Sequence, residues 1–318
     1  MFRFIQSRLF FQAVGIVAVL AWAIVQLVTS TQYVPLSSPV MYWPSIAPIQ
    51  GSYVAMCLII AFGLLLQLVL VDVYFFRGGF GDSHHLMVVL WFLLIICCGG
   101  FVAQLSPVWM SNIILAIIIS LNFDYDRGNL KNKDFLSGML TAVASLFYPP
   151  MLFVAFFVVS SLIINRFSKY KDIIVYFLGI LTIYLYVFCF YFFTDRLSEL
   201  GEMLMEVRFY NTFAATTVYS WKEIVLLSAT FLSLLYCFFI LKIQYDNKPV
   251  LLRKRLVTIH LITFSMLMMM IFSPFDIHQS VGFLLIPFTL YYAMLSQMKE
   301  HPFVNDLMML IFVVALCL

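Results

Sequence analysis

Apolar runs long enough to cross a lipid bilayer follow one another along almost the whole of this sequence, with only short polar segments between them. A helix of about 20 apolar residues spans the ~30 Å hydrocarbon core of a membrane. The chain of 318 residues is 64% hydrophobic and 10% charged, whereas soluble domains are about 25% charged. This much apolar surface exceeds what a soluble domain can bury. The sequence therefore predicts an all-α fold, a polytopic helical integral membrane protein.

The polar breaks divide the chain into about 11 predicted transmembrane helices, which leave no room for a soluble domain. We therefore expect residues 1–318 to form a single transmembrane domain. The first run follows a basic start and lacks a signal-peptide cleavage pattern, so it is predicted to remain as a signal anchor. The predicted spans are residues 9–28, 51–76, 86–104, 107–121, 135–148, 150–164, 173–193, 221–241, 256–272, 281–296 and 303–318.

Basic residues are concentrated in alternate connections between the predicted helices. With a cytoplasmic N-terminus, all but three of the 18 Lys and Arg residues fall on the cytoplasmic side, the exceptions being Arg196, Arg208 and Lys222. The positive-inside rule then predicts a bacterial inner (cytoplasmic) membrane protein with its N-terminus in the cytoplasm. The stretch "KPVLLRKR" is interpreted as a topology anchor near anionic headgroups, the alternative being a binding site. The predicted cytoplasmic loops are residues 77–85, 122–134, 165–172, 242–255 and 297–302.

Several kinds of site find no support in the sequence. All six cysteines lie inside apolar runs, which argues against a disulfide framework or a zinc site. A net charge of +3 is too small to indicate nucleic-acid binding. The stretch "RGGFGD" at 77–82 lacks the preceding strand and following helix of a phosphate-binding loop. We therefore expect no cofactor, no metal and no nucleic acid, and membrane lipids as the main contacts.

Two longer connections, 29–50 and 194–220, are predicted to face outward. The first contains no charged residue and four prolines, so it cannot form a regular helix. It is interpreted as a stiff connection lying on the membrane or as an outer lid beside a groove. Aromatic residues, Tyr148 and Trp221 among them, are expected at the outer ends of helices, in the belt typical of membrane proteins.

The second outer connection contains a helical pattern, "TDRLSELGEMLMEVRFYNT". At the helical period its acidic residues fall on one side and its apolar residues on another, which predicts a helix lying in the membrane interface. The acidic side comprises Asp195, Glu199, Glu202 and Glu206, and the apolar side Leu197, Leu200, Leu204 and Val207.

Arg208 follows this pattern beside its apolar side and is a candidate for substrate binding. A guanidinium binds phosphate in a bidentate manner, so Arg208 would hold the phosphate of a lipid-linked substrate, with Glu206 and Tyr210 in the same candidate site. The alternative is that Arg208 only extends to a lipid headgroup.

The stretch "SPFDIHQSVGFLLIP", residues 273–287, places an acid and a histidine two positions apart in a predicted outward elbow. In the functional interpretation, Asp276 orients His278, which acts as a general base toward an acceptor hydroxyl. In the structural interpretation, Asp276 caps the next helix by accepting its first N–H groups, and His278 lies in its first turn.

Few ionisable side chains lie within the predicted spans, which argues against an ion-coupled transporter or a channel. His260 is expected about one turn into the predicted helix 256–272. Gln67 and Asn112 are neutral, and they are expected to hydrogen-bond between helices.

The stretch "FLSGMLTAVASLFYPPMLFVAFFVVSSLIINR", residues 135–166, joins two short apolar helices across a Tyr-Pro-Pro turn. Its layout resembles the central helical hairpin of the C-type glycosyltransferase transmembrane scaffold, and "SVGFLLIPFTLYYAML" resembles a late helix of that scaffold. The order of these segments is similar to an uncharacterised multi-pass inner-membrane family of Bacteroidota. Small residues are expected to let the first helix approach its neighbours closely. They are Gly138, Ala142, Ala144 and Ser145.

The resemblance implies a protein of cell-envelope biogenesis that acts on a polyprenyl-phosphate-linked glycan through an outward-facing groove. C-type enzymes generally carry an acidic residue in the first outer loop, and residues 29–50 contain none. Three functions therefore stay open: a lipid-linked glycan transferase, a non-catalytic subunit of an envelope assembly, secretion or motility complex, and a lipid-handling or flipping protein.

Overall fold

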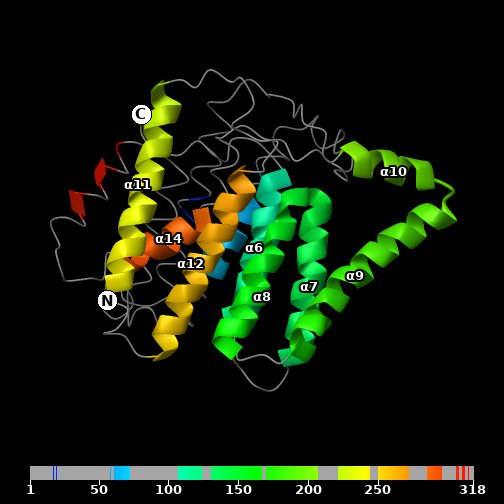
Figure 1. Ribbon diagram of the computed structural model, residues 1–318. Coiled ribbons are helices and arrows are strands. Elements are labelled where there is room, and N and C mark those ends of the chain that lie inside the picture. The colour runs from blue at the N-terminus through cyan, green and yellow to red at the C-terminus, as the bar shows by residue number, and fades with distance from the viewer. Residues whose placement is uncertain are drawn as a thin grey trace.

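The part of the chain that the computed structural model describes is helical and contains no strand, which confirms the all-α prediction (Figure 1). The structure describes residues 17, 19, 58, 61–71, 107–123, 130–166, 170–206, 221–243, 250–271, 285–295, 306, 307, 310, 311 and 314. The elements are α6 (Pro107–Phe123), α7 (Leu130–Phe147), the 3-10 turn η2 (Pro149–Leu152), α8 (Phe153–Arg166), α9 (Tyr170–Phe193), α10 (Leu197–Glu206), α11 (Trp221–Ile243), α12 (Val250–Ile271) and α14 (Leu285–Leu295).

The helices α7 and α9 pack backbone to backbone where two glycines meet. A Cβ atom at Gly138 would collide with the carbonyl oxygen of Tyr176 and lie 3.2 Å from the Cα of Gly179. A Cβ atom at Gly179 would collide with the carbonyl oxygen of Phe135. The close approach expected at Gly138 is therefore confirmed, and α7 makes its most extensive interface there, with α6 also packed on it.

The chain turns sharply between α7 and α8. Pro149 and Pro150 open the η2 turn, because proline fits the first positions of a helix but lacks the N–H needed further in. Tyr148 stands just before them and is completely buried, so it does not belong to an exposed aromatic belt. Trp221, at the start of α11, is exposed.

The remaining described helices extend the bundle on the other side of α8. Helix α12 packs along α8, and α14 contacts both α11 and α12. In Figure 1, α9 diverges from α7 toward its far end, where α10 continues from it at an angle. Helix α9 therefore lies at one edge of the described bundle.

Apolar side chains both fill the interior of this bundle and cover its surface, and some polar side chains are buried among them. The buried polar residues are mostly Ser, Thr and Asn, and several of the hydroxyls donate to the carbonyl oxygen of the residue four positions earlier. Exposed Phe, Leu and Ile side chains cover α9 and α11. Soluble proteins rarely expose apolar surface this extensive.

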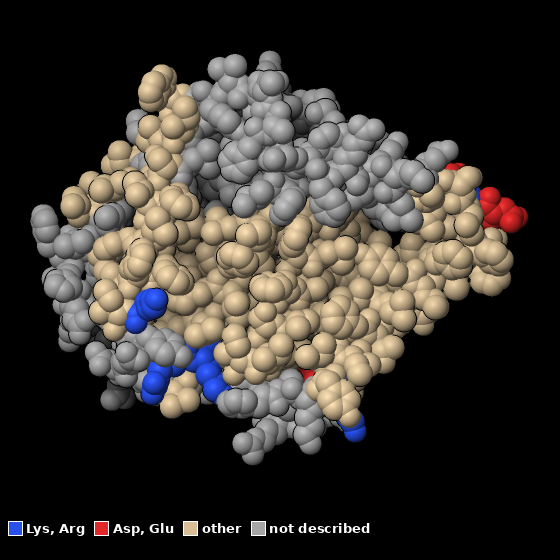
Figure 2. All heavy atoms as spheres, in the orientation of Figure 1, with Lys and Arg blue, Asp and Glu red and all other residues tan. Residues whose placement is uncertain are grey.

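Charged side chains are separated toward opposite ends of the described bundle. On the face shown in Figure 2, blue Lys and Arg atoms lie along the lower edge, where α9 and α12 begin, and the largest group of red Asp and Glu atoms lies at α10. Tan atoms, which belong to residues other than Lys, Arg, Asp and Glu, occupy the band between them.

Among the described residues, α9 is the one helix long and apolar enough to cross a membrane by length and composition. The number of 11 transmembrane helices is thus not confirmed. Two helices also begin more than one turn earlier than predicted, α7 at Leu130 and α12 at Val250. Both starts are rich in Leu, Lys or Arg, and these straight-chain residues keep most of their rotamer freedom in a helix.

Candidate functional site

The corner between α9 and α10 leads into the helix that precedes Arg208 and Tyr210 in the sequence. The backbone N–H of Arg196 donates to the carbonyl oxygen of Tyr191 at 3.0 Å, and the N–H of Asp195 donates to that of Phe192 at 3.3 Å. Asp195 adopts a left-handed conformation with φ 55°. These features form a Schellman motif, which ends a helix by satisfying its last carbonyl groups.

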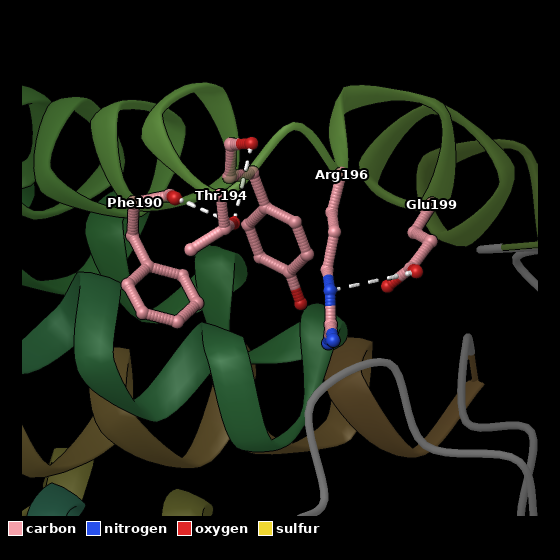
Figure 3. A network of polar contacts seen from close by, with 5 residues as sticks. Phe190, Thr194, Arg196 and Glu199 are labelled. Atoms are coloured by element: carbon pink, nitrogen blue, oxygen red, sulfur yellow. Dashed lines mark hydrogen bonds and ion pairs between the residues drawn. The ribbon is translucent and has the colours of Figure 1, made fainter.

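The side chains at the corner reinforce the turn (Figure 3). The hydroxyl of Thr194 donates to the carbonyl oxygen of Phe190 at 2.8 Å. The guanidinium of Arg196 lies 3.9 Å from the carboxylate of Glu199, and both side chains are exposed. Glu199 is in the first turn of α10, where a carboxylate interacts favourably with the helix dipole. An exposed pair of this kind contributes little to stability.

The predicted amphipathic helix exists, but it begins later than the sequence pattern indicated. Helix α10 starts at Leu197, so Asp195 belongs to the turn and not to the acidic side of the helix. Leu200 is 9% exposed and Leu197 is 43% exposed, so the two leucines do not share one buried side. The left-handed residue redirects the chain before the helix begins.

The structure does not describe the side chains of the residues predicted to act on a substrate. Glu206 is the last residue of α10, and its side chain is not described. Arg208, Tyr210, Asp276 and His278 fall outside the described residues. The first outer loop, 29–50, falls outside them as well.

A histidine that the sequence interpretation placed near a helix end is half-buried where three helices meet. Because α12 begins at Val250 and has 22 residues, His260 is close to its middle rather than one turn from its start. Its Nδ1 atom lies 2.6 Å from the hydroxyl oxygen of Tyr291 on α14. The ring of Phe238, on α11, meets the imidazole at a centroid distance of 4.7 Å. Three helices thus meet at one ionisable side chain.

A second polar group ties α6, α7 and α9 together. The amide nitrogen of Asn122 donates to the carbonyl oxygen of Ile118 at 2.8 Å and lies 3.4 Å from the hydroxyl of Ser137. One turn later on α7, the hydroxyl of Thr141 accepts a hydrogen bond from Tyr176 on α9 at 3.0 Å. Since every contact within this group joins neighbouring helices or a helix to itself, it fixes packing and offers no group to a ligand.

Another such contact joins α7 and α9 further along, where the hydroxyls of Ser145 and Tyr184 hydrogen-bond at 2.6 Å. Gln67 was expected to bridge helices, yet its amide is buried and makes no hydrogen bond within the described structure. Such a group destabilises a fold, because its desolvation is not compensated.

A sequence feature at the start of α12 would have placed His260 correctly within the helix. Pro249 stands directly before that helix, and proline is common at a helix start. A helix that begins beside Pro249 places His260 near its middle without further information.

Comparison with protein-family models, with curated proteins and with solved structures finds no match to this chain.

Proposed function

We propose that this protein is a multi-pass inner-membrane protein of cell-envelope biogenesis that binds a lipid-linked substrate of the polyprenyl-phosphate glycan class on its outward side. The observation that carries the proposal is the course of α9, which is apolar and exposed around most of its circumference and then turns sharply into the charged start of α10. The apolar helix α9 suits the hydrocarbon core of a bilayer, and the charged start of α10 suits the headgroup region.

The length of α9 supports a span. Its 24 residues extend over ~36 Å, slightly more than the ~30 Å hydrocarbon core. Most of its surface would be in contact with lipid, because only Tyr176 and Gly179 are buried. In water, this much exposed apolar surface would drive aggregation.

The separation of charge supports the orientation. The starts of α9 and α12 and the end of α11 lie toward one end of the described bundle, and they contain Lys171, Lys242, Arg253 and Lys254. The positive-inside rule assigns a basic end of this kind to the cytoplasm. The α9–α10 corner then lies at the outer leaflet. The substrate phosphate would lie there, held by Arg208, two residues beyond the end of α10.

A second function, that of a non-catalytic membrane subunit, is favoured by the aromatic surface of α9. The rings of Phe188 and Phe192 stack at 6.3 Å, and those of Phe192 and Phe193 meet edge to face at 5.7 Å. Exposed aromatic side chains of this kind also suit packing against another membrane helix.

The orientation is tested by thiol labelling in a variant without native cysteines. Ser198→Cys on α10 should react with a membrane-impermeant maleimide in intact spheroplasts, and Lys171→Cys at the start of α9 should react only after permeabilisation. Both positions are exposed, so accessibility within the protein is matched. Labelling in the reverse order would overturn the proposed orientation.

The substrate class is tested with a deletion strain complemented by charge-reversal variants. Arg208→Glu should cause lipid-linked glycan precursors to accumulate as the deletion does, whereas Arg196→Glu, a matched basic residue of the same corner, should restore the normal level. If both variants restore the normal precursor level equally well, Arg208 does not bind the substrate phosphate. Normal glycolipids in the deletion strain would favour the subunit function.

A further inference from the structure

The end of α11 and the start of α12 carry basic side chains that the proposed function does not use. The two helices run antiparallel, so that α11 ends and α12 begins on the same side of the bundle (Figure 1). They meet where the ring of Phe238 on α11 packs against the imidazole of His260 on α12, at a centroid distance of 4.7 Å. This contact gives a common level from which positions on both helices can be counted.

Helical periodicity places one basic residue of each helix on the face that makes this contact. Lys242 is four residues after Phe238, and Arg253 is seven residues before His260. Residues four or seven positions apart share one face of an α-helix. Because the helices are antiparallel, both residues lie on the same side of the ring contact, Lys242 ~6 Å and Arg253 ~10 Å along the axis. The two side chains therefore belong to the same end of the interface between α11 and α12.

The two cations differ in how they are held. Lys242 is exposed, whereas Arg253 is half-buried and its Nε atom is buried. The guanidinium of Arg253 is thus held against the bundle, while the flexible side chain of Lys242 can adjust its position. An anion at this place would meet one fixed cation and one adaptable cation.

The surrounding sequence does not neutralise these charges. From Lys242 to Arg255 the chain contains five basic residues and one acidic residue, Asp246, which gives this segment a net charge of +4. Neither α12 nor α14 contains an acidic residue, and Glu223, the one acid of α11, lies near the opposite end of that helix. Blue atoms accordingly gather in Figure 2 where α11 ends and α12 begins. Positive charge concentrated in this way attracts an anion.

Apolar side chains lead away from Lys242 along α11. Leu235 and Phe238 lie on the same face of the helix as Lys242, and they are 38% and 39% exposed. Phe239, beside them, is exposed as well. A phospholipid has the same order of parts, an acyl chain that ends in a phosphate. The arrangement therefore suits an anionic lipid better than an anion dissolved in water.

We propose that Lys242 and Arg253 bind the phosphate of an anionic phospholipid of the phosphatidylglycerol class, whose acyl chain packs along Leu235 and Phe238. The inference rests on the proposed function in one respect, the orientation that places this end of the bundle at the cytoplasmic leaflet, where anionic headgroups attract basic residues. An ammonium and a guanidinium can donate to one phosphate together.

The net positive charge makes the site selective between two common phospholipids. Phosphatidylethanolamine has the same phosphate as phosphatidylglycerol, but its ammonium is repelled by the basic residues around the site. Native mass spectrometry of the full-length protein in detergent micelles measures the selectivity, with the two lipids carrying identical acyl chains. The first phosphatidylglycerol should bind on the order of tenfold more tightly than phosphatidylethanolamine. Equal affinities, or tighter binding of phosphatidylethanolamine, would overturn the proposal.

Three substitutions separate a shared phosphate site from general surface charge. Lys242→Gln and Arg253→Gln should each weaken the binding of phosphatidylglycerol on the order of tenfold. The double variant should lose less than the product of the two losses, because both side chains hold one phosphate. Lys171→Gln is the control, since Lys171 is exposed at the start of α9, toward the same end of the bundle, and this variant should bind normally. Equal weakening by all three variants, or independent losses at Lys242 and Arg253, would show that these residues act only as a topology anchor.

Conservative variants separate a loss of charge from a loss of folding. Lys242→Arg and Arg253→Lys keep both charges and should keep the preference for phosphatidylglycerol. If these variants lose the preference as well, it depends on the packing of the original side chains and the proposal is wrong. Binding in micelles does not depend on the orientation of the protein in the cell. The thiol-labelling test of the proposed function can therefore succeed or fail separately from this one.

Discussion

At the scale of single residues, Asp195 determines how α9 ends and how the chain turns into α10. It is the one residue other than glycine with positive φ in the described structure, and it stands at the position where helices most often carry glycine. Aspartate tolerates this conformation because its short polar side chain can hydrogen-bond locally. The turn therefore depends on a backbone conformation that β-branched residues avoid.

We predict that Asp195→Val will lower the free energy of unfolding by about 1–2 kcal/mol, because the branched side chain is strained at this φ. Asp195→Gly should be as stable as the original protein or slightly more stable, since it relieves the same strain. Unfolding in mixed detergent micelles with increasing SDS measures both. Equal loss in the two variants would mean that the carboxylate, and not the backbone conformation, matters.

At the scale of elements, the crossing of α7 and α9 allows a sharper test. Gly138→Ala brings a Cβ atom against backbone atoms of α9 that cannot move aside. We expect a loss of about 1–3 kcal/mol in the free energy of unfolding, as for other overpacked positions. The same SDS titration reports it.

Gly201 provides the matched control for this substitution. It lies in α10, is exposed, and has no atom within 4 Å of the position that a Cβ would occupy. Gly201→Ala should therefore raise stability, by about 0.5–1 kcal/mol from helix propensity alone. If the two Gly→Ala substitutions change the free energy of unfolding in opposite directions, the loss at Gly138 is due to the close packing of α7 against α9. A neutral Gly138→Ala would show that α7 and α9 are not in close contact.

The same elements show what the sequence could and could not predict. The small side chains of α7 and the double proline predicted a close approach and a turn, because both effects are local. The left-handed turn at Asp195 was missed, since aspartate also fits a helix start. His260 was assigned to a helix end because basic residues were taken to end the helix, although straight-chain Lys and Arg favour helices. Its contact with Tyr291, 31 positions away, depends on the tertiary fold. The candidate residues Arg208, Asp276 and His278 stay predictions.

At the scale of the whole molecule, the surface of α9 distinguishes a membrane protein from a water-soluble bundle. Leu181 lies near the middle of this helix and is 59% exposed. In water, replacement of an exposed leucine by arginine is nearly neutral, because the new charge is solvated and no packing is lost. In a bilayer the same substitution places a cation in hydrocarbon, at a cost of about 2.5–3.5 kcal/mol in membrane insertion.

We therefore predict that Leu181→Arg will reduce the amount of protein recovered in alkali-washed inner membranes by a large factor. Phe193→Arg is the control, since Phe193 is 80% exposed but ends the helix, where an arginine can extend to the headgroups. It should be recovered normally. Because both variants replace an exposed apolar side chain with the same charge, any difference between them reports depth in the bilayer. Normal membrane recovery of Leu181→Arg would mean that α9 faces water, and the proposed orientation and function would lose their basis.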